Sequence, residues 1–558
     1  MQLDAQGYFS NVGARVIPVG VNYWPASCGV EMWPAWPVAE IQHDLDVVQQ
    51  LGMNCVRFFL RWQDFEPEPE RYDPRMFLRL AELLGWFRER GLYAHPSFFV
   101  GWMSGGIFWP AWKGPRNLYT DPFMARRAAA FARHAAAVCA GYDDAIIGLD
   151  FGNEMSCLPD SGQATTGEIL AWAAEISRAI RLVYPSSLLV SGNEHHQVVG
   201  EPGWPLGEVP GVDFHSMHAY PVPGWLPMPV DGLTDPWCQS LLPFFTQVAR
   251  TFGPVMVQEF GTIFTAGPVQ QDAYLRALLP ACWQAGANGF LWWCLRDVVS
   301  SVHPYQKSSF EGTLGLVDAK DQVKPGLNYF IEFASTLAER PLPTGSAEAI
   351  GLYFPTHFYA RDNPQNPGNG GQMTGRRLAI AHYQLQALGR IVRVVRGGQP
   401  IDPALQTLVI PGVCLTSCEV ETLTVWVEQG GQLIWHGPAW SSWGHVQRKL
   451  IGAAPVDFRA IRPVTLVLDS FTWGFTHYPE HTRIQVQPDA AEVIIHDGDF
   501  PILLRHTLGR GCVVTMLPLV EEEILAIAAD RSTRDRWTGW YRSMLELVGR
   551  PHSMAALR

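Results

Sequence analysis

Residues 147–154 have the sequence Ile-Gly-Leu-Asp-Phe-Gly-Asn-Glu, and residues 255–261 have the sequence Val-Met-Val-Gln-Glu-Phe-Gly. Each stretch is a short, mainly apolar run that reaches a glutamate, as expected of a strand buried inside a protein. When parallel strands close into a barrel, their C-terminal ends meet at one face. Glu154 and Glu259 are therefore expected to lie at the same rim and to face one pocket.

Strands and helices alternate over the first 340 or so residues. Strands are expected at residues 16–24, 54–60, 92–100, 145–154, 187–193, 212–221, 254–261 and 287–295. Helices are expected at residues 38–51, 73–90, 122–140, 167–184, 236–252 and 269–285. This α/β pattern predicts a (β/α)₈ TIM barrel. An open doubly wound sheet is the alternative, but its first strand needs a glycine-rich phosphate loop, and residues 20–25 (Gly-Val-Asn-Tyr-Trp-Pro) do not supply one.

The sequence changes character after a Pro- and Gly-containing linker at residues 340–346. Strands at 349–354, 391–395, 408–412 and 432–436, with helices at 377–388 and 418–429, predict a smaller α/β domain. A β-rich stretch and a helix at 533–548 follow. The expected division is a barrel at 1–340, a second domain at 341–457 and a β-rich segment at 458–558, which could belong to the second domain.

Charge and cysteine content bear on partners and location. With 41 Lys and Arg against 53 Asp and Glu, the net charge of −12 disfavours nucleic acid or an anionic membrane as a partner. No apolar run approaches the ~20 residues that span a bilayer. Residues 1–13 do not resemble a secretion signal, so a cytoplasmic location is expected. The ten cysteines, including Cys414 and Cys418, lack metal-ligand spacing, so neither a metal nor a cofactor is expected.

Several of the 22 tryptophans occur in Gly- and Pro-rich loops, among them Trp102, Trp109 and Trp225. Indole faces on loops match the C–H faces of sugar rings, which favours a carbohydrate as the substrate. Cleavage of a glycosidic bond needs two carboxyl groups, and about 5–5.5 Å separates them in the mechanism that retains anomeric configuration. One glutamate at a strand end could equally be a solvated loop residue. Two of them, Glu154 and Glu259, favour glycosidase chemistry.

These motifs resemble the clan A glycoside hydrolases, in which an Asn-Glu pair ends strand four and a second glutamate ends strand seven. The resemblance covers the first 340 residues and implies that Glu154 is the acid/base and Glu259 the nucleophile of a retaining enzyme. It also implies that Asn153 binds the sugar 2-hydroxyl. The sequence Gly-Asn-Glu-Met at 152–155 lacks the proline that follows the glutamate in many family 5 members.

Other family 5 motifs supply supporting residues. Asn-Cys-Val-Arg at 54–57 resembles Asn-x-x-Arg, which would place Arg57 beside the nucleophile, although a buried structural ion pair is the alternative. His-Ala-Tyr at 218–220 resembles His-x-Tyr, with Tyr220 near the nucleophile and His218 as a substrate contact or a core histidine. Arg57 and Tyr220 would lower the pKa of the nucleophile. Trp293 resembles the tryptophan of subsite −1.

The second domain resembles the flavodoxin-like, amidotransferase-like domain of family 42 β-galactosidases, on the sequences at 408–412 and 427–434. In that family the domain builds a trimer, so a homo-oligomer (trimer or dimer) is implied here. Cys414 and Cys418 lack the strand-to-helix elbow of an amidotransferase nucleophile, which indicates a structural domain without that activity.

The expected function is therefore a retaining β-glycosidase, exo-acting on short oligosaccharides, with β-mannosides favoured. β-Galactosides and β-glucosides, endo-acting β-mannanase activity, transglycosylation and a non-catalytic carbohydrate-binding barrel are the alternatives. Glu194, His195 and His196 follow strand five and could form a metal cluster, but substrate contact or simple loop polarity is favoured.

Overall fold

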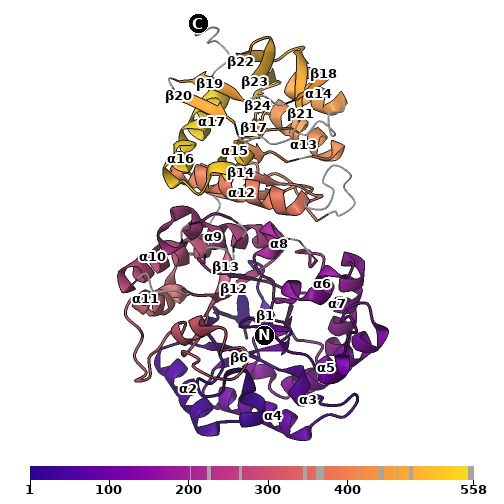
Figure 1. Ribbon diagram of the computed structural model, residues 1–558, viewed down its shortest axis with the longest axis vertical. Helices are drawn as coiled ribbons and strands as arrows, with labels where there is room; N and C mark the ends of the chain where they lie inside the picture. Colours follow the sequence, from indigo (N-terminus) through magenta and orange to yellow (C-terminus); the bar gives the residue numbers. More distant parts are fainter. Residues whose placement is uncertain are drawn as a thin grey trace. The chain divides into compact units, whose positions relative to one another are not determined.

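The computed structural model consists of two compact units, coloured along the chain in Figure 1. The first comprises residues 1–197, 201–227 and 231–343, and the second comprises residues 198–200, 228–230 and 344–558. The structure describes all residues except 201–202, 223–225, 227, 231, 263–266, 344–347, 360–369, 414, 439–444, 461–462, 470, 477–481 and 551–558. Trp225, Cys414 and part of the expected linker therefore lie outside the described residues.

The first unit is built around an eight-stranded parallel sheet in the order β10-β9-β6-β5-β4-β13-β12-β11. Its strands are β4 (Val19–Asn22), β5 (Cys55–Phe59), β6 (Tyr93–Phe99), β9 (Leu149–Gly152), β10 (Leu189–Val190), β11 (His215–Ala219), β12 (Val255–Phe260) and β13 (Ala287–Trp292). Backbone hydrogen bonds from Asp213 N to Leu189 O (2.9 Å) and from His195 N to His218 O (3.1 Å) bridge the two outermost strands. The predicted TIM barrel is confirmed.

Helices surround the barrel in Figure 1, and their starts follow local sequence signals. The long helices are α2 (Val38–Gln50), α4 (Pro74–Glu89), α5 (Pro122–Ala140), α7 (Thr166–Arg181), α9 (Pro236–Arg250), α10 (Pro268–Gln284) and α11 (Asn328–Thr336). Three begin with an Asp-Pro pair, in which the side chain of Asp73, Asp121 or Asp235 accepts backbone N–H groups of the first turn. Short helices and strands lie in the loops: α1 (Met32–Ala35), α3 (Trp62–Phe65), α6 (Pro159–Gly162), α8 (His196–Val199), β7 (Trp102–Met103) and β8 (Gly106–Ile107).

A small antiparallel sheet precedes the barrel, and the sequence did not predict it. It consists of β1 (Gln2–Leu3), β2 (Phe9–Asn11) and β3 (Ala14–Val16). Phe9 is fully buried with Phe214 at a ring-centroid distance of 5.1 Å, and both belong to a core cluster with Met256 and Leu291 of the barrel strands. This sheet therefore packs an aromatic side chain into the barrel core.

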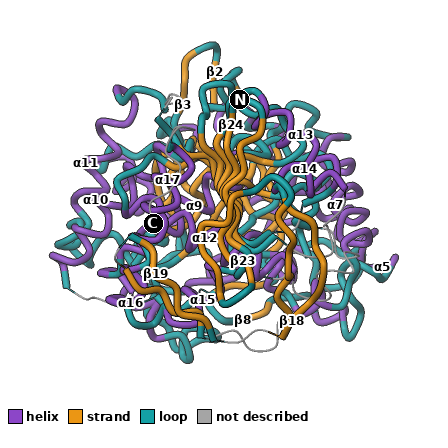
Figure 2. The backbone as a smooth tube through the Cα atoms, turned by 90° about the horizontal axis from the view of Figure 1, so that it is seen from above, coloured by secondary structure: helices purple, strands orange, loops and turns teal. Residues whose placement is uncertain are grey.

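The second unit has a seven-stranded sheet in the order β15-β14-β16-β17-β24-β23-β22. The first five are parallel: β14 (Ile350–Phe354), β15 (Val392–Arg396), β16 (Thr407–Pro411), β17 (Gln432–His436) and β24 (Gly511–Met516). Their order, 2-1-3-4-5 along the chain, is that of flavodoxin-like sheets. Helices α12 (Gly370–Ala387) and α17 (Thr538–Gly549) lie on one face, and α13 (Ser417–Glu428) and α14 (His445–Ile451) on the other (Figure 2).

The β-rich C-terminal stretch joins this same sheet. Strands β22 (Glu492–Asp497) and β23 (Phe500–Leu508) extend it antiparallel to β24. Two further pairs stand apart from it: β18 (Ala453–Ala460) with β21 (Thr482–Pro488), and β19 (Val464–Leu468) with β20 (Phe471–Phe475). The helix expected at 533–548 is divided into α16 (Arg531–Arg536) and α17, preceded by α15 (Val520–Ile527). Among the described helices, none has the length and apolar character required to cross a membrane.

Candidate active site

The two strand-end glutamates converge on one cavity at the rim of the barrel. The cavity has a volume of about 360 Å³, and Glu154, Glu259, Asn153, Tyr220 and Trp293 all line it. One carboxyl oxygen of Glu154 and one of Glu259 lie within 4.8 Å of each other. That separation fits the ~5–5.5 Å of retaining glycosidases and is too short for the ~6.5–9.5 Å of inverting ones.

A tight backbone crossing positions Glu154 after β9. Its own backbone is left-handed, with φ of 46° and ψ of 50°, and its N–H donates to the carbonyl of Gly192 at 3.2 Å. A Cβ atom on Gly192 would lie 1.8 Å from the carbonyl oxygen of Gly152, so only glycine permits this approach. The backbone of Glu154 itself is thus strained, and its position depends on a glycine at residue 192.

A bulge in β12 turns two consecutive side chains into the barrel. Met217 pairs with Val257 and His218 with Glu259, which leaves Gln258 as an extra residue on β12. Strand side chains normally alternate between faces, and a bulge breaks this alternation. Gln258 and Glu259 consequently both contact groups inside the barrel.

Arg57 is fully buried below the cavity and bonds to several strands. It donates to Glu259 Oε2 at 3.1 Å, to Asp150 Oδ2 at 2.8 Å and to Asn153 Oδ1 at 2.9 Å. Further hydrogen bonds reach Asn22 at 3.1 Å and Ser97 at 2.9 Å. The two alternatives for Arg57 are therefore both met, because it lies beside Glu259 and also forms a buried ion pair with Asp150.

Replacing Arg57 by methionine is expected to lower the free energy of unfolding by about 3–5 kcal/mol, because it leaves the carboxylates of Asp150 and Glu259 buried without their cation. Urea denaturation monitored by tryptophan fluorescence measures this change. Arg71→Met is the matched control, since its ion pair with Glu68 is exposed and is worth less than about 1 kcal/mol. Equal losses in the two variants would contradict the assignment.

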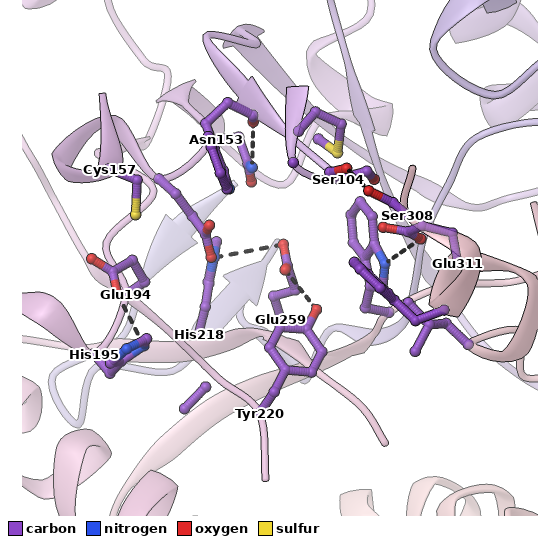
Figure 3. Close-up of a pocket in the computed structure, with 18 of the residues that line it drawn as sticks. Ser104, Asn153, Cys157, Glu194, His195, His218, Tyr220, Glu259, Ser308 and Glu311 are labelled. Carbon is purple, nitrogen blue, oxygen red and sulfur yellow. Dashed lines mark hydrogen bonds and ion pairs between the residues drawn. The ribbon is translucent and has the colours of Figure 1, made fainter. Parts of the chain in front are cut away.

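Glu259 accepts two hydrogen bonds and lies near His218. Tyr220 donates to its Oε1 at 2.6 Å, Arg57 bonds its Oε2, and His218 Nδ1 lies 3.5 Å from the same oxygen (Figure 3). Burial nevertheless raises the pKa of Glu259 above its usual value, although Arg57 and Tyr220 act in the opposite direction. Arg57 and Tyr220 therefore lower this pKa as expected, but desolvation outweighs them and the net shift is upward.

Glu154 has the stronger shift. Burial, with the nearby negative charge of Glu194, raises the pKa of Glu154 to about 7. Its Oε1 lies 3.0 Å from His218 Nδ1. His218 is thus a buried side chain that lies beside both glutamates and lines the cavity, and its role as a substrate contact stays a prediction. A carboxyl group with this pKa can be protonated near neutral pH.

One wall of the cavity carries Cys157, Glu194, His195 and His196 (Figure 3). Nδ1 of His196 lies 2.7 Å and Nδ1 of His195 3.0 Å from Glu194 Oε2. Burial raises the pKa of Glu194, but the two histidines outweigh it and hold the pKa well below its usual range. Glu194 raises the pKa of His196 to about 9.

Two groups in the described part of the chain offer three metal-ligating atoms within 4.8 Å of one another: Cys157 with Glu194 and His196, and Glu154 with His218 and Glu259. In the first group, Glu194 and His196 already form an ion pair. In the second, every member is bonded to a neighbouring side chain. Side-chain contacts within the chain thus explain why the members of each group lie close together.

The opposite wall carries Glu311, which the sequence analysis missed. Trp293 Nε1 donates to its Oε2 at 3.2 Å, and burial raises the pKa of Glu311 to about 7. Trp292, the next residue back, packs outside the barrel against Phe330 of α11 at 6.1 Å between ring centroids. Of the loop tryptophans, Trp102 also lines the cavity, whereas Trp109 packs against Trp62 at 6.2 Å.

Comparison with known proteins supports these observations. Residues 20–328 match the family Cellulase (glycosyl hydrolase family 5). The exo-beta-1,4-mannosidase Op5Man5 from Opitutaceae bacterium strain TAV5 is 46% identical, with 97% of this chain and 99% of that chain covered and a TM-score of 0.93. No curated protein sequence matches the chain significantly.

Two more distant structures share the fold. A GH5_18 protein from Streptomyces cattleya in complex with GlcNAc is 22% identical over 71% of this chain and 99% of that chain, with a TM-score of 0.61. A cold-adapted beta-galactosidase from Rahnella sp. R3 is 14% identical over 95% of this chain and 89% of that chain, with a TM-score of 0.69. The family match and the 46% identity together show that the chain is a glycoside hydrolase and belongs to glycosyl hydrolase family 5.

Proposed function

We propose that the protein is a retaining exo-β-mannosidase that removes a terminal mannose from short β-linked oligosaccharides. The observation that carries the proposal is the pair of carboxyl oxygens within 4.8 Å of each other in the cavity at the barrel rim. The 46% identical relative, which is named an exo-beta-1,4-mannosidase and is covered over nearly its full length, supports mannose as the sugar.

In the proposed reaction, Glu259 attacks the anomeric carbon while Glu154 gives its proton to the departing oxygen. The covalent glycosyl–enzyme ester then reacts with water, from which Glu154 takes a proton, and Glu259 leaves as a carboxylate. Esterification removes the charge of Glu259, which lowers the pKa of Glu154 for this second step. Asn153, held by Arg57 and by the carbonyl of Trp102, would bond the sugar 2-hydroxyl.

The walls of the cavity favour exo action. Residues 102–105 line it on one side, and Ser308, Phe310, Glu311 and Leu314 line it on another. Its volume of about 360 Å³ lies at the small end for ligand sites, as suits a terminal sugar more than a long polymer. Trp293 offers an apolar face to the ring, and Glu311 offers acceptor oxygens to its hydroxyls.

Initial rates on p-nitrophenyl β-glycosides of mannose, galactose, glucose, xylose and fucose test the proposal. We expect the mannoside to have a kcat/KM at least about 10-fold above the others, since a pocket that bonds one hydroxyl pattern strongly rejects another. Exo action on β-1,4-mannotriose should release one mannose and one mannobiose, and the mannobiose should then be cleaved to mannose. Preference for the galactoside would favour the β-galactosidase alternative, for which the shared fold with a beta-galactosidase is the observation. Faster cleavage of internal bonds in β-mannan would overturn exo action.

We also propose that the second unit is a non-catalytic domain related to the one in family 42 β-galactosidases, and that it serves a homo-oligomer. Its flavodoxin-like strand order and the shared fold with a beta-galactosidase over 95% of the chain support this view. Light scattering of the full chain tests it, because a monomer at micromolar concentration would contradict it.

A further inference from the structure

A line of fully buried polar groups runs across the barrel to Glu154. It includes His95 of β6 and Gln258 of β12, and among the described residues neither of these two lines the cavity. A polar group in such a place must be hydrogen-bonded, and each bond needs one donor and one acceptor. The donors can therefore be assigned in turn along the line.

The assignment begins at His95. Its Nδ1 lies 2.8 Å from the carbonyl oxygen of Gly148, which can only accept, so Nδ1 carries the proton. Burial lowers the pKa of His95 to about 4, so the ring is neutral at working pH. A neutral imidazole has one N–H only, and Nε2 of His95 is therefore an acceptor.

Gln258 comes next, and two contacts fix its orientation. Its Nε2 lies 2.6 Å from His95 Nε2 and 3.3 Å from Asp150 Oδ2. Asp150 is ion-paired with Arg57, so its oxygen accepts. The amide NH₂ must face these two acceptors, which leaves Oε1 of Gln258 facing His218 Nε2 at 2.8 Å.

His218 transmits this orientation to the acid. Its Nε2 donates to Gln258 Oε1, and burial lowers the pKa of His218, so the ring is neutral. Its Nδ1 is then an acceptor, 3.0 Å from Glu154 Oε1. Only a protonated carboxyl group can donate to it, and a carboxylate there would face a lone pair.

Other charged groups also face this line. Glu154 is influenced by Glu194, His195, His196 and Arg57. His218 is influenced by Glu259, Arg57 and Asp150. His95 is influenced by Asp150 and Arg57. These charges have both signs, so they act on the protonation of Glu154 in opposite directions. The direction of the hydrogen bonds, in contrast, favours only the protonated form of Glu154.

We propose that His95 and Gln258 are positioning residues, which fix the Nε2–H tautomer of His218 and thereby keep Glu154 protonated in the free enzyme. The proposal rests on the proposed role of Glu154 as acid/base. After Glu154 has given its proton to the departing oxygen, its carboxylate faces the lone pair of His218 Nδ1. This makes it a stronger base toward the water that completes the reaction.

Gln258→Met tests the proposal, since methionine has a similar shape but its thioether is only a weak acceptor for His218 Nε2–H. With this hydrogen bond weakened, His218 can carry its proton on Nδ1 and donate to a Glu154 carboxylate. We expect the basic limb of the kcat/KM profile for β-1,4-mannobiose to move down by about one pH unit, which is ~10-fold in rate above that limb. A 2,4-dinitrophenyl mannoside, whose leaving group needs no proton, should lose less than about 3-fold.

Gln271→Met on α10 is the matched control, because Gln271 is a buried glutamine that donates to Thr262 Oγ1 at 2.9 Å and does not line the cavity. It should leave both substrates and the pH profile unchanged. Equal losses of both substrates in Gln258→Met with an unmoved pH limb would overturn the proposal and indicate a purely structural role.

A second measurement needs neither a stable variant at position 258 nor turnover. In wild-type protein carrying ¹⁵N-labelled histidine, the signals lost in His218→Asn should report a neutral ring protonated on Nε2. A ring protonated on Nδ1, or on both nitrogens, would overturn the proposal. If the proposed function is wrong, the wild-type enzyme will cleave no glycoside, and this result is distinct from the histidine measurement.

Discussion

Replacement of Glu259 by glutamine is expected to lower kcat for every β-glycoside by on the order of 10⁵-fold or more, because an amide cannot form the glycosyl ester. Glutamine matches glutamate in shape and keeps an acceptor oxygen for Tyr220. The fold should therefore persist, which circular dichroism can verify. Initial rates on the preferred aryl glycoside measure the loss.

The control for this prediction is Glu175→Gln on α7, where the carboxylate is exposed and pairs only locally with Arg178. Its activity should equal that of the wild type. A 2-deoxy-2-fluoro glycosyl fluoride should add one sugar to the wild-type chain and none to the Glu259 variant. Substantial turnover by the variant would direct attention to Glu311, the next carboxyl group in the cavity.

Glu154→Ala is expected to lower kcat/KM by an amount that depends on the leaving group of the substrate. General acid catalysis is worth about 10²–10⁴-fold, so kcat/KM for β-1,4-mannobiose should fall by that amount. For a 2,4-dinitrophenyl glycoside it should fall less than about 10-fold, because this leaving group departs without a proton. Azide should accelerate the variant, since it attacks the glycosyl ester without a general base.

The pH dependence of activity tests the same assignment of Glu154 as the acid. The wild type should lose activity toward mannobiose as the pH rises through about 7, because Glu154 then loses the proton it must donate. Activity should also fall at low pH as Glu259 becomes protonated, and its raised pKa moves that limb upward from the usual carboxyl range. In Glu154→Ala the basic limb should disappear from the residual activity toward mannobiose. A limb that remains near pH 7 would assign it to another group, with Glu311 as the candidate.

Sequence periodicity was sufficient for the barrel and for the meeting of its strand ends. Helix α5 begins and ends at the expected residues because Asp121 and Pro122 mark its start. The position of Glu154 opposite Glu259 follows from topology, since parallel strands share one rim. Asp150 also carried a signal, because a charge inside an apolar strand requires a buried partner, here Arg57.

Three features of the site could not be predicted from the periodicity of the sequence. Glu311 lies in a turn of 3-10 helix after the last strand, so nothing in its neighbours marks it as a cavity residue. The bulge at Gln258 adds one residue to a strand, and a period-two pattern cannot reveal which residue is extra. The effect of Arg57 and Tyr220 on the pKa of Glu259 was predicted with the right sign, but the upward net shift was not, because contacts can be inferred from motifs, whereas depth of burial cannot.

The left-handed backbone of Glu154 lowers the stability of the fold, whereas its side chain is needed for catalysis. A residue with a side chain costs of order 1–3 kcal/mol in that conformation, and glycine relieves most of it. Selection for thermal tolerance alone would therefore enrich glycine at position 154 and discard the acid. Laboratory evolution of this enzyme consequently requires turnover to be scored in every round.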